Sequence, residues 1–117
     1  MRANLFLLPS TYDTASLTPI EAGALKLPTL MTLGCPTAEI INDGISGLLA
    51  KEDDVFDWAE KMIWAIEHKE EMKNMKDVAY QEVFRTWDSV AEELREYYIN
   101  ICQKQCINGE LRGANIN

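Results

Sequence analysis

The sequence lacks long apolar runs and is poor in basic residues. The longest apolar run near the start, Leu5 to Leu8, ends at Pro9, far short of the roughly 20 residues that a membrane-spanning helix needs. Only 11 basic side chains stand against 19 acidic ones, so the formal net charge is −8. A surface of that charge is unsuited to nucleic-acid phosphates and to anionic lipids. We therefore expect a soluble protein that binds no nucleic acid.

Cysteine and histidine are also scarce. The three cysteines, Cys35, Cys102 and Cys106, are odd in number and have no framework spacing, which favours a reducing, cytoplasmic compartment. Cys102 and Cys106 would share one face of a helix, but zinc usually needs four ligands. Neither Cys35 nor His68, the only histidine, stands at a ligand spacing from that pair. We therefore predict no metal site and no cofactor.

The first half of the chain alternates between short apolar runs and helix signals. Apolar runs at residues 4–9, 28–32 and 46–50 are typical of strands buried on both faces of a parallel sheet. Helices are predicted between them, at residues 18–26 and 37–42. This order predicts an α/β fold, a partial Rossmann-like domain with a short parallel sheet flanked by helices.

The second half has a helical period. One helix is predicted after Asp53, a weaker one at residues 70–84, and a third that Thr86 caps. Residues 1–105 are predicted to form one domain portion and residues 106–117 a flexible tail. The stripe of the first helix that we expect to pack on the sheet consists of Val55, Ala59, Met62 and Ile66, flanked by Phe56 and Ile63, and the stripe of the third consists of Val90, Leu94, Tyr97 and Ile101.

The segment between the first strand and the first helix holds the candidate site. It places Asp13 in the loop after the carboxyl end of a strand, and Glu21 in the first turn of the following helix. Open α/β sheets bind ligands at that edge, and free N–H groups at a helix start favour a phosphate. The candidate donor-binding residues are Asp13, Thr14, Ala15, Ser16, Leu17, Thr18 and Glu21.

The same residues also have a purely structural interpretation. Thr18 and Glu21, with Pro19 between them, have the spacing of a capping box, which needs no ligand. Asp13 and Thr14 form a common turn pair. The spacing alone leaves both interpretations open.

The segment resembles the signature of the family-4 glycosyltransferases, a large retaining group with the GT-B architecture of two Rossmann-like domains. In that signature, two glutamates separated by seven residues flank a glycine-rich loop that opens a helix. Asp13 stands at the position of the first glutamate and Glu21 at the position of the second. The resemblance spans about residues 3–100 and continues in order through Glu21-Ala22-Gly23-Ala24-Leu25, Leu27-Pro28-Thr29, residues 39–49, Thr86-Trp87 and Val90-Ala91.

The resemblance implies the C-terminal part of a donor-binding domain in a hexosyltransferase. Such an enzyme transfers a sugar from a nucleotide-diphosphate-sugar donor to an acceptor, here an unspecified glycan, lipid or small molecule, with retention and without an obligatory metal. By resemblance, Glu21 binds the ribose, Asp13 the transferred sugar, and the amides near Ser16 and Leu17 the diphosphate. The rest of the site would lie outside this chain, which we expect to be inactive alone and to self-associate through exposed apolar surface.

Four positions depart from the family pattern. Asp13 is one methylene shorter than glutamate, Thr14 and Ser16 replace glycines, and Lys26 stands where glycine is usual. A side chain at a glycine position restricts the backbone to negative φ.

The alternative hypothesis is a non-enzymatic α/β module that binds a nucleotide or a protein partner. Its acidic surface and its aromatic residues Trp58, Trp64, Tyr97 and Tyr98 are the features that would serve such binding, although aromatic side chains more often belong to a core.

Overall fold

The computed structural model describes residues 3–107, with side chains as far as residue 104. The chain divides into two compact units, Met1–Phe84 and Arg85–Asn117, which we describe separately. Among the described residues, no helix is both long and apolar enough to cross a membrane.

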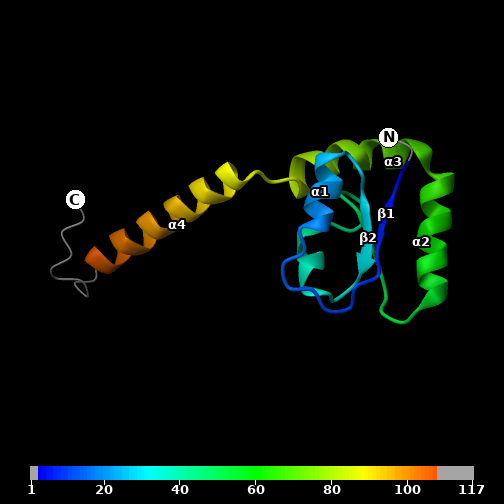
Figure 1. The fold of residues 1–117 in the computed structure, drawn as a ribbon, viewed down its shortest axis with the longest axis horizontal. Helices are drawn as coiled ribbons and strands as arrows, with labels where there is room; N and C mark the ends of the chain where they lie inside the picture. The colour runs from blue at the N-terminus through cyan, green and yellow to red at the C-terminus, as the bar shows by residue number, and fades with distance from the viewer. Residues whose placement is uncertain (1–2, 108–117) are drawn as a thin grey trace. The chain divides into compact units, whose positions relative to one another are not determined.

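A parallel sheet forms the centre of the first unit (Figure 1). Its three strands are β1 (Phe6–Leu8), β2 (Thr29–Thr32) and β3 (Leu48–Ala50), in the order β1-β2-β3. Both neighbouring pairs run parallel, so each connection crosses over through helical structure. The three strands lie within the three predicted apolar runs, which confirms the α/β fold and the short parallel sheet.

Helical segments cover both faces of this sheet (Figure 1). The predicted helix at residues 37–42 is a 3-10 turn that begins one residue earlier, and the predicted helix at residues 70–84 ends in a π-helical turn. In chain order the segments are α1 (Thr18–Ala24), η1 (Pro36–Ile40), α2 (Val55–Glu67), α3 (Lys69–Val78) and η2 (Ala79–Val83).

The core lies on both sides of β2, because this central strand is buried on both faces. Leu30 and Met31 are both fully buried, and successive side chains of a strand point to opposite faces. Leu30 packs with Leu48, Ala50, Met72 and Met75, beneath α2 and α3. Met31 packs with Cys35, Ala38, Ile41 and Val83 on the other face.

The predicted inward stripe of α2 is wrong in part. Trp58 and Ala65 pack against the core with Met62, whereas Phe56 is 84% exposed and Ile66 is 70% exposed. The helix has 13 residues, about 20 Å, while the strands have three or four residues, about 10–13 Å. The ends of α2 therefore extend past the sheet, and the partly buried Trp58 ring packs against the core instead. The remaining predicted stripe residues with exposed side chains are Val55 and Ile63.

His68 joins α2 to α3. It follows the last residue of α2 and precedes the first residue of α3. Its ring stacks on Trp64 with 4.6 Å between ring centroids, and its Nδ1 lies 2.9 Å from the Trp64 carbonyl oxygen. His68 is therefore a structural residue of this junction, and both Trp58 and Trp64 belong to the packed part of the unit.

The second unit contains the helix α4 (Trp87–Ile107). The hydroxyl of Thr86 accepts a hydrogen bond from the Ser89 amide at 3.1 Å, which confirms the predicted cap. Tyr97 and Tyr98 are exposed, so the expectation that they are core residues is wrong for this unit. The helix includes the first two residues of the predicted tail, and residues 108–117 lie outside the described residues.

Candidate functional site

The loop between β1 and α1 is fastened to the turn that follows β2. Thr37 holds it at two points: its hydroxyl donates to the Asp13 carbonyl at 2.6 Å and accepts from the Ser16 amide at 3.2 Å. The Thr37 amide also donates to the Asp13 carbonyl, at 3.0 Å. Because parallel strands end at the same edge of the sheet, the loop lies at the carboxyl edge, where the sequence placed it.

Thr37 was missed by the sequence interpretation. It is 5% exposed and lies 24 positions from Asp13, in a turn that was assigned no functional role. The available signal was topological: the turn after β2 and the loop after β1 must meet if the two strands are parallel neighbours.

Asp13 has the turn-forming role that was one of its two interpretations. Its Oδ1 accepts a hydrogen bond from the Ala15 amide at 3.3 Å, the pattern of an aspartate turn. The residue is only half-buried, and Thr14 and Ala15 beside it are exposed. The turn therefore presents the Asp13 carboxylate at the surface of the loop.

The capping box predicted at the start of α1 is wrong. The cap position is Leu17, with no side-chain cap hydrogen bond, and Thr18 is already helical. The Thr18 hydroxyl lies 2.8 Å from the Ser16 hydroxyl instead. The Leu17 carbonyl accepts the first helical bond, from the Glu21 amide at 2.9 Å, so Leu17 and not Thr18 takes the cap position. The exposed Glu21 carboxylate thus has no capping role that would account for it.

The amides predicted to hold a diphosphate differ in their availability. The Ser16 amide already donates to Thr37. The first backbone bond of α1 runs from the Glu21 amide to the Leu17 carbonyl, at 2.9 Å, so the Leu17 and Thr18 amides precede the helical ladder. Of the amides in this loop, Leu17 and Thr18 are therefore the better placed for an anion.

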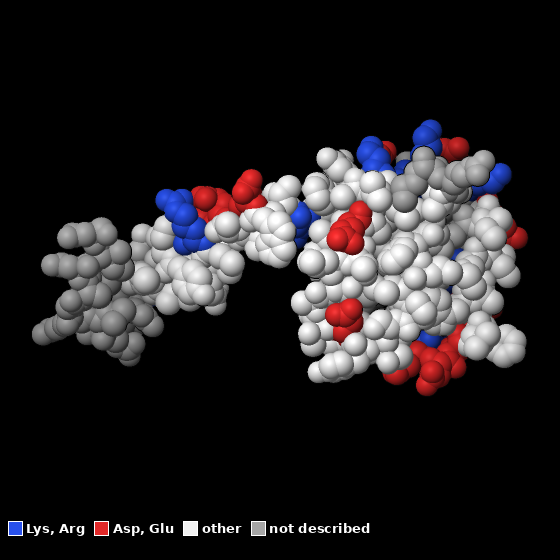
Figure 2. Space-filling view, in the orientation of Figure 1, with Lys and Arg blue, Asp and Glu red and all other residues white. Residues whose placement is uncertain are grey.

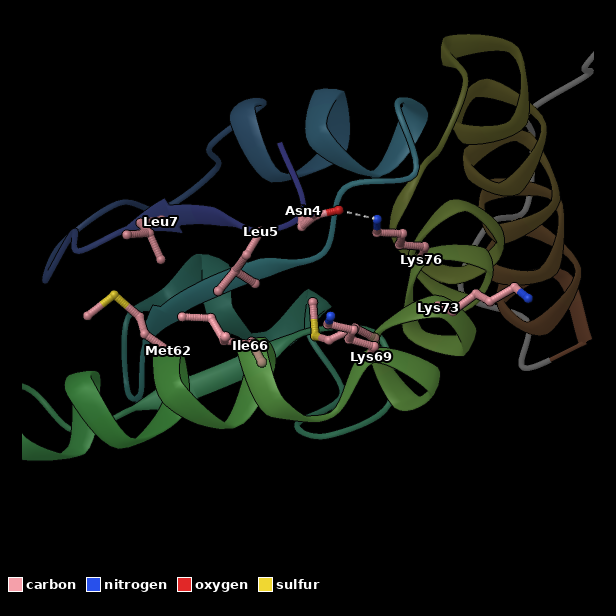
Figure 3. A pocket seen from close by; sticks show the side chains of 10 residues that line it. Asn4, Leu5, Leu7, Met62, Ile66, Lys69, Lys73 and Lys76 are labelled. Carbon is pink, nitrogen blue, oxygen red and sulfur yellow. Dashed lines mark hydrogen bonds between the residues drawn. The ribbon is translucent and has the colours of Figure 1, made fainter. Parts of the chain in front are cut away.

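Two of the cavities formed by the described residues lie beside the sheet, and neither of these two contains Asp13 or Glu21. The smaller, about 310 Å³, lies at the carboxyl edge and shares only Pro9 with the loop; its other lining includes Thr32, Asp54 and Trp58. The larger, about 520 Å³, lies between β1, α2 and α3 (Figure 3). Asp13 is half-buried and Glu21 is exposed, so both lie at the surface rather than in either of these cavities. Within the described residues, no three His, Cys, Asp or Glu side chains come together as a metal site would require.

Lys26 has the backbone conformation that explains why the family pattern has glycine there. Its φ is +55°, in the left-handed region. Its ammonium lies 2.7 Å from Asp77 on α3 and 5.7 Å from the centre of the Tyr80 ring. The hydrogen bond and charge of Asp77 raise the pKa of Lys26, and those of Lys26 lower the pKa of Asp77. These contacts offset part of the strain and hold the end of α1 against α3.

Comparison with known proteins gives similarity to sucrose-phosphate synthases. The chain is 30% identical over 103 residues to a probable sucrose-phosphate synthase of Thermosipho melanesiensis, a match that covers 86% of this chain and 22% of the relative. The structure is similar to that of a sucrose-phosphate synthase from Thermosynechococcus elongatus, with a TM-score of 0.73 and 19% identity, over 87% of this chain and 26% of the other. The chain therefore spans about a quarter of the length of these relatives.

The family assignment rests on the first unit. Residues 1–82 match the family described as glycosyl transferases group 1, a range that includes the whole sheet and the loop from Asp13 to Glu21. The match ends just before the boundary of that unit at Phe84. The structural similarity supports the same α/β fold independently of sequence identity. The chain belongs to the group 1 glycosyl transferase family.

Proposed function

We propose that this chain forms part of the donor site of a retaining, family-4 glycosyltransferase with GT-B architecture. The enzyme transfers a hexose from a nucleotide-diphosphate sugar to an acceptor, in the cytoplasm. The observation that carries the proposal is the position of the Asp13–Glu21 segment: it lies at the carboxyl edge of a parallel sheet, inside the range that matches the family. Glu21 binds the ribose hydroxyls, and Asp13 binds the transferred sugar.

The chemistry of this segment is electrostatic. Negative charge develops on the diphosphate as it leaves, and preorganised amide donors stabilise such charge. The Leu17 and Thr18 amides supply two donors, whereas the Ser16 amide is held by the Thr37 hydroxyl. The segment from Pro9 to Ala22 contains no lysine or arginine, so the cations that balance a diphosphate come from other parts of the enzyme.

Donor binding tests the proposal directly. We would titrate the isotopically labelled chain with UDP-, GDP- and ADP-glucose and follow the amide signals of Ser16, Leu17 and Thr18. One of these donors is expected to shift those signals. Replacing Glu21 with glutamine is expected to weaken that binding about tenfold or more, because a hydrogen bond to a charged group contributes about 1.5–3 kcal/mol.

Glu60→Gln is the matched control, since it makes the same change on α2, at an exposed position away from the loop. Its affinity for the donor should equal that of the unmodified chain. Equal affinity for Glu21→Gln as well would remove the assignment of Glu21. The absence of any donor-induced shift in the loop would count against the donor site itself. The same donors are to be used in assays of sugar transfer to acceptors. One of these assays follows the formation of sucrose phosphate, the product named in the relatives' descriptions.

A further inference from the structure

The two carboxylates of the candidate site, those of Asp13 and Glu21, are held by different parts of the fold. Asp13 lies in the loop before α1, and its carbonyl oxygen accepts hydrogen bonds from the turn that follows β2. The donors are the Thr37 hydroxyl at 2.6 Å, the Thr37 amide at 3.0 Å and the Cys35 thiol at 3.6 Å. Cys35 and Thr37 are both buried. The backbone of Asp13 is therefore fixed to η1.

Glu21 lies on α1, which packs against a different part of the unit. Gly23 of this helix lies so close to η2 that a Cβ there would be 3.0 Å from the Ala79 carbonyl oxygen. Just after the helix, the Lys26 ammonium lies 2.7 Å from the Asp77 carboxylate of α3. The position of Glu21 therefore depends on contacts of α1 with α3 and η2.

The direction of each carboxylate follows from its backbone. Neither Asp13 nor Glu21 has an ion-pair partner among the described residues. On the visible surface over the loop before α1, acidic side chains stand apart in a largely uncharged area (Figure 2). The Asp13 carboxylate accepts one local hydrogen bond, from the Ala15 amide at 3.3 Å. Moving η1 away from the loop would therefore move the Asp13 carboxylate and leave Glu21 in place.

We propose that Thr37 is a positioning residue for the sugar part of the donor and has no such role for the nucleotide part. The inference rests on the proposed function, in which Asp13 binds the transferred sugar and Glu21 the ribose. The Thr37 hydroxyl bridges Asp13 and Ser16, so it fixes both ends of the turn that presents the Asp13 carboxylate. Without the hydroxyl this turn moves, and hydrogen bonds to the sugar weaken steeply as their angles change.

The ratio of two dissociation constants isolates this role. The donor among UDP-, GDP- and ADP-glucose that shifts the loop signals is compared with its own nucleoside diphosphate, which lacks the sugar. In Thr37→Val, affinity for the donor should fall about threefold or more relative to affinity for the diphosphate, because charge-assisted bonds to the sugar are weakened. Thr37→Ser keeps the hydroxyl and should retain the ratio of the unmodified chain. A general loss of stability would lower both affinities together and leave the ratio unchanged.

A double-mutant cycle tests whether Thr37 acts through Asp13. Asp13→Asn removes the charge that faces the sugar and should lower the same ratio. Adding Thr37→Val to Asp13→Asn should then lower the ratio little further, because the effects of residues in one network are not additive. Fully additive effects would refute the route through Asp13. Gly23→Ala is the crossed control: it displaces α1 with Glu21, and should weaken the binding of donor and diphosphate by the same factor.

The Thr37 amide gives a second measurement, which needs no substitution and holds if Thr37→Val unfolds. This amide donates to the Asp13 carbonyl, so its NMR signal should shift when the donor binds and shift less with the diphosphate. An unchanged ratio in Thr37→Val overturns the inference, as does a Thr37 amide that responds equally to both ligands; the proposed function survives either result. The absence of any donor-induced shift in the loop removes the proposed function, and this inference with it.

Discussion

Thr37 offers a direct test of how the candidate loop is held. Thr37→Val keeps the shape of the side chain but removes the hydroxyl, and with it the bonds to the Asp13 carbonyl and the Ser16 amide. Each such bond contributes about 0.5–1.5 kcal/mol, so the free energy of unfolding should fall by about 1–3 kcal/mol. The Asp13 carbonyl keeps the Thr37 amide as a partner, whereas the Ser16 amide loses its acceptor.

The assay is hydrogen exchange at the Ser16 amide, combined with thermal unfolding. In Thr37→Val this amide should exchange faster than in the parent, and the melting temperature should fall by about 4–8 °C for each kcal/mol lost. Thr37→Ser is the matched control: it retains the hydroxyl and loses a methyl group, so it should lose some stability but keep the Ser16 amide protected. Unchanged protection and an unchanged melting temperature in Thr37→Val would refute the clamp.

Three further changes test other parts of the structure. Gly47→Ala should lower the free energy of unfolding by about 1–3 kcal/mol, measured by denaturant titration, because its Cβ would lie 2.6 Å from the Thr29 carbonyl oxygen. Thr18→Ala should change the melting temperature little, since Thr18 is not the cap; a clear loss would restore the capping box. Asp77→Asn should lower the melting temperature at neutral pH. Because Lys26 lowers the pKa of Asp77, that difference should shrink as the pH falls below the carboxyl's usual value of 3.8 and vanish once the pH is below the lowered pKa, and a difference that persists below the lowered pKa would contradict the pair.

The strands and the position of the loop could be predicted because they depend on local sequence. Short apolar runs that alternate with helix signals require parallel crossovers, although of the three strands only β2 is buried at every position, and Leu7 of β1 is 44% exposed. The face of α2 could not be predicted in the same way. Its periodicity is compatible with several rotations, and the choice depends on contacts with the short sheet, which leave Val55 and Phe56 exposed.

The arrangement of the candidate site depends on contacts between distant residues. Asp13 and Thr37 are 24 positions apart, and only the pairing of β1 with β2 brings them together. The capping box failed for the opposite reason, since it was a local pattern that the geometry overrode: with Leu17 at the cap position and Pro19 in the first turn, the Thr18 side chain turns to Ser16. A local sequence motif therefore does not by itself fix the role of its residues; the backbone geometry decides it.

The three glycine positions at which this chain departs from the family pattern differ in their physical cost. Among the described residues, the only non-glycine residues with positive φ are Lys26 and Asp53, so Thr14 and Ser16 sit in the loop without left-handed strain. Fastened through Thr37, the loop does not require the conformations for which glycine is needed. Lys26 does adopt such a conformation, at +55°, and it is the position where the side chain forms an ion pair with Asp77 across to α3. Thr14 and Ser16 therefore replace glycine without backbone strain, because the Thr37 hydroxyl shapes the loop around them. Lys26 replaces glycine at a position that keeps a positive φ, and there its side chain gains the ion pair with Asp77.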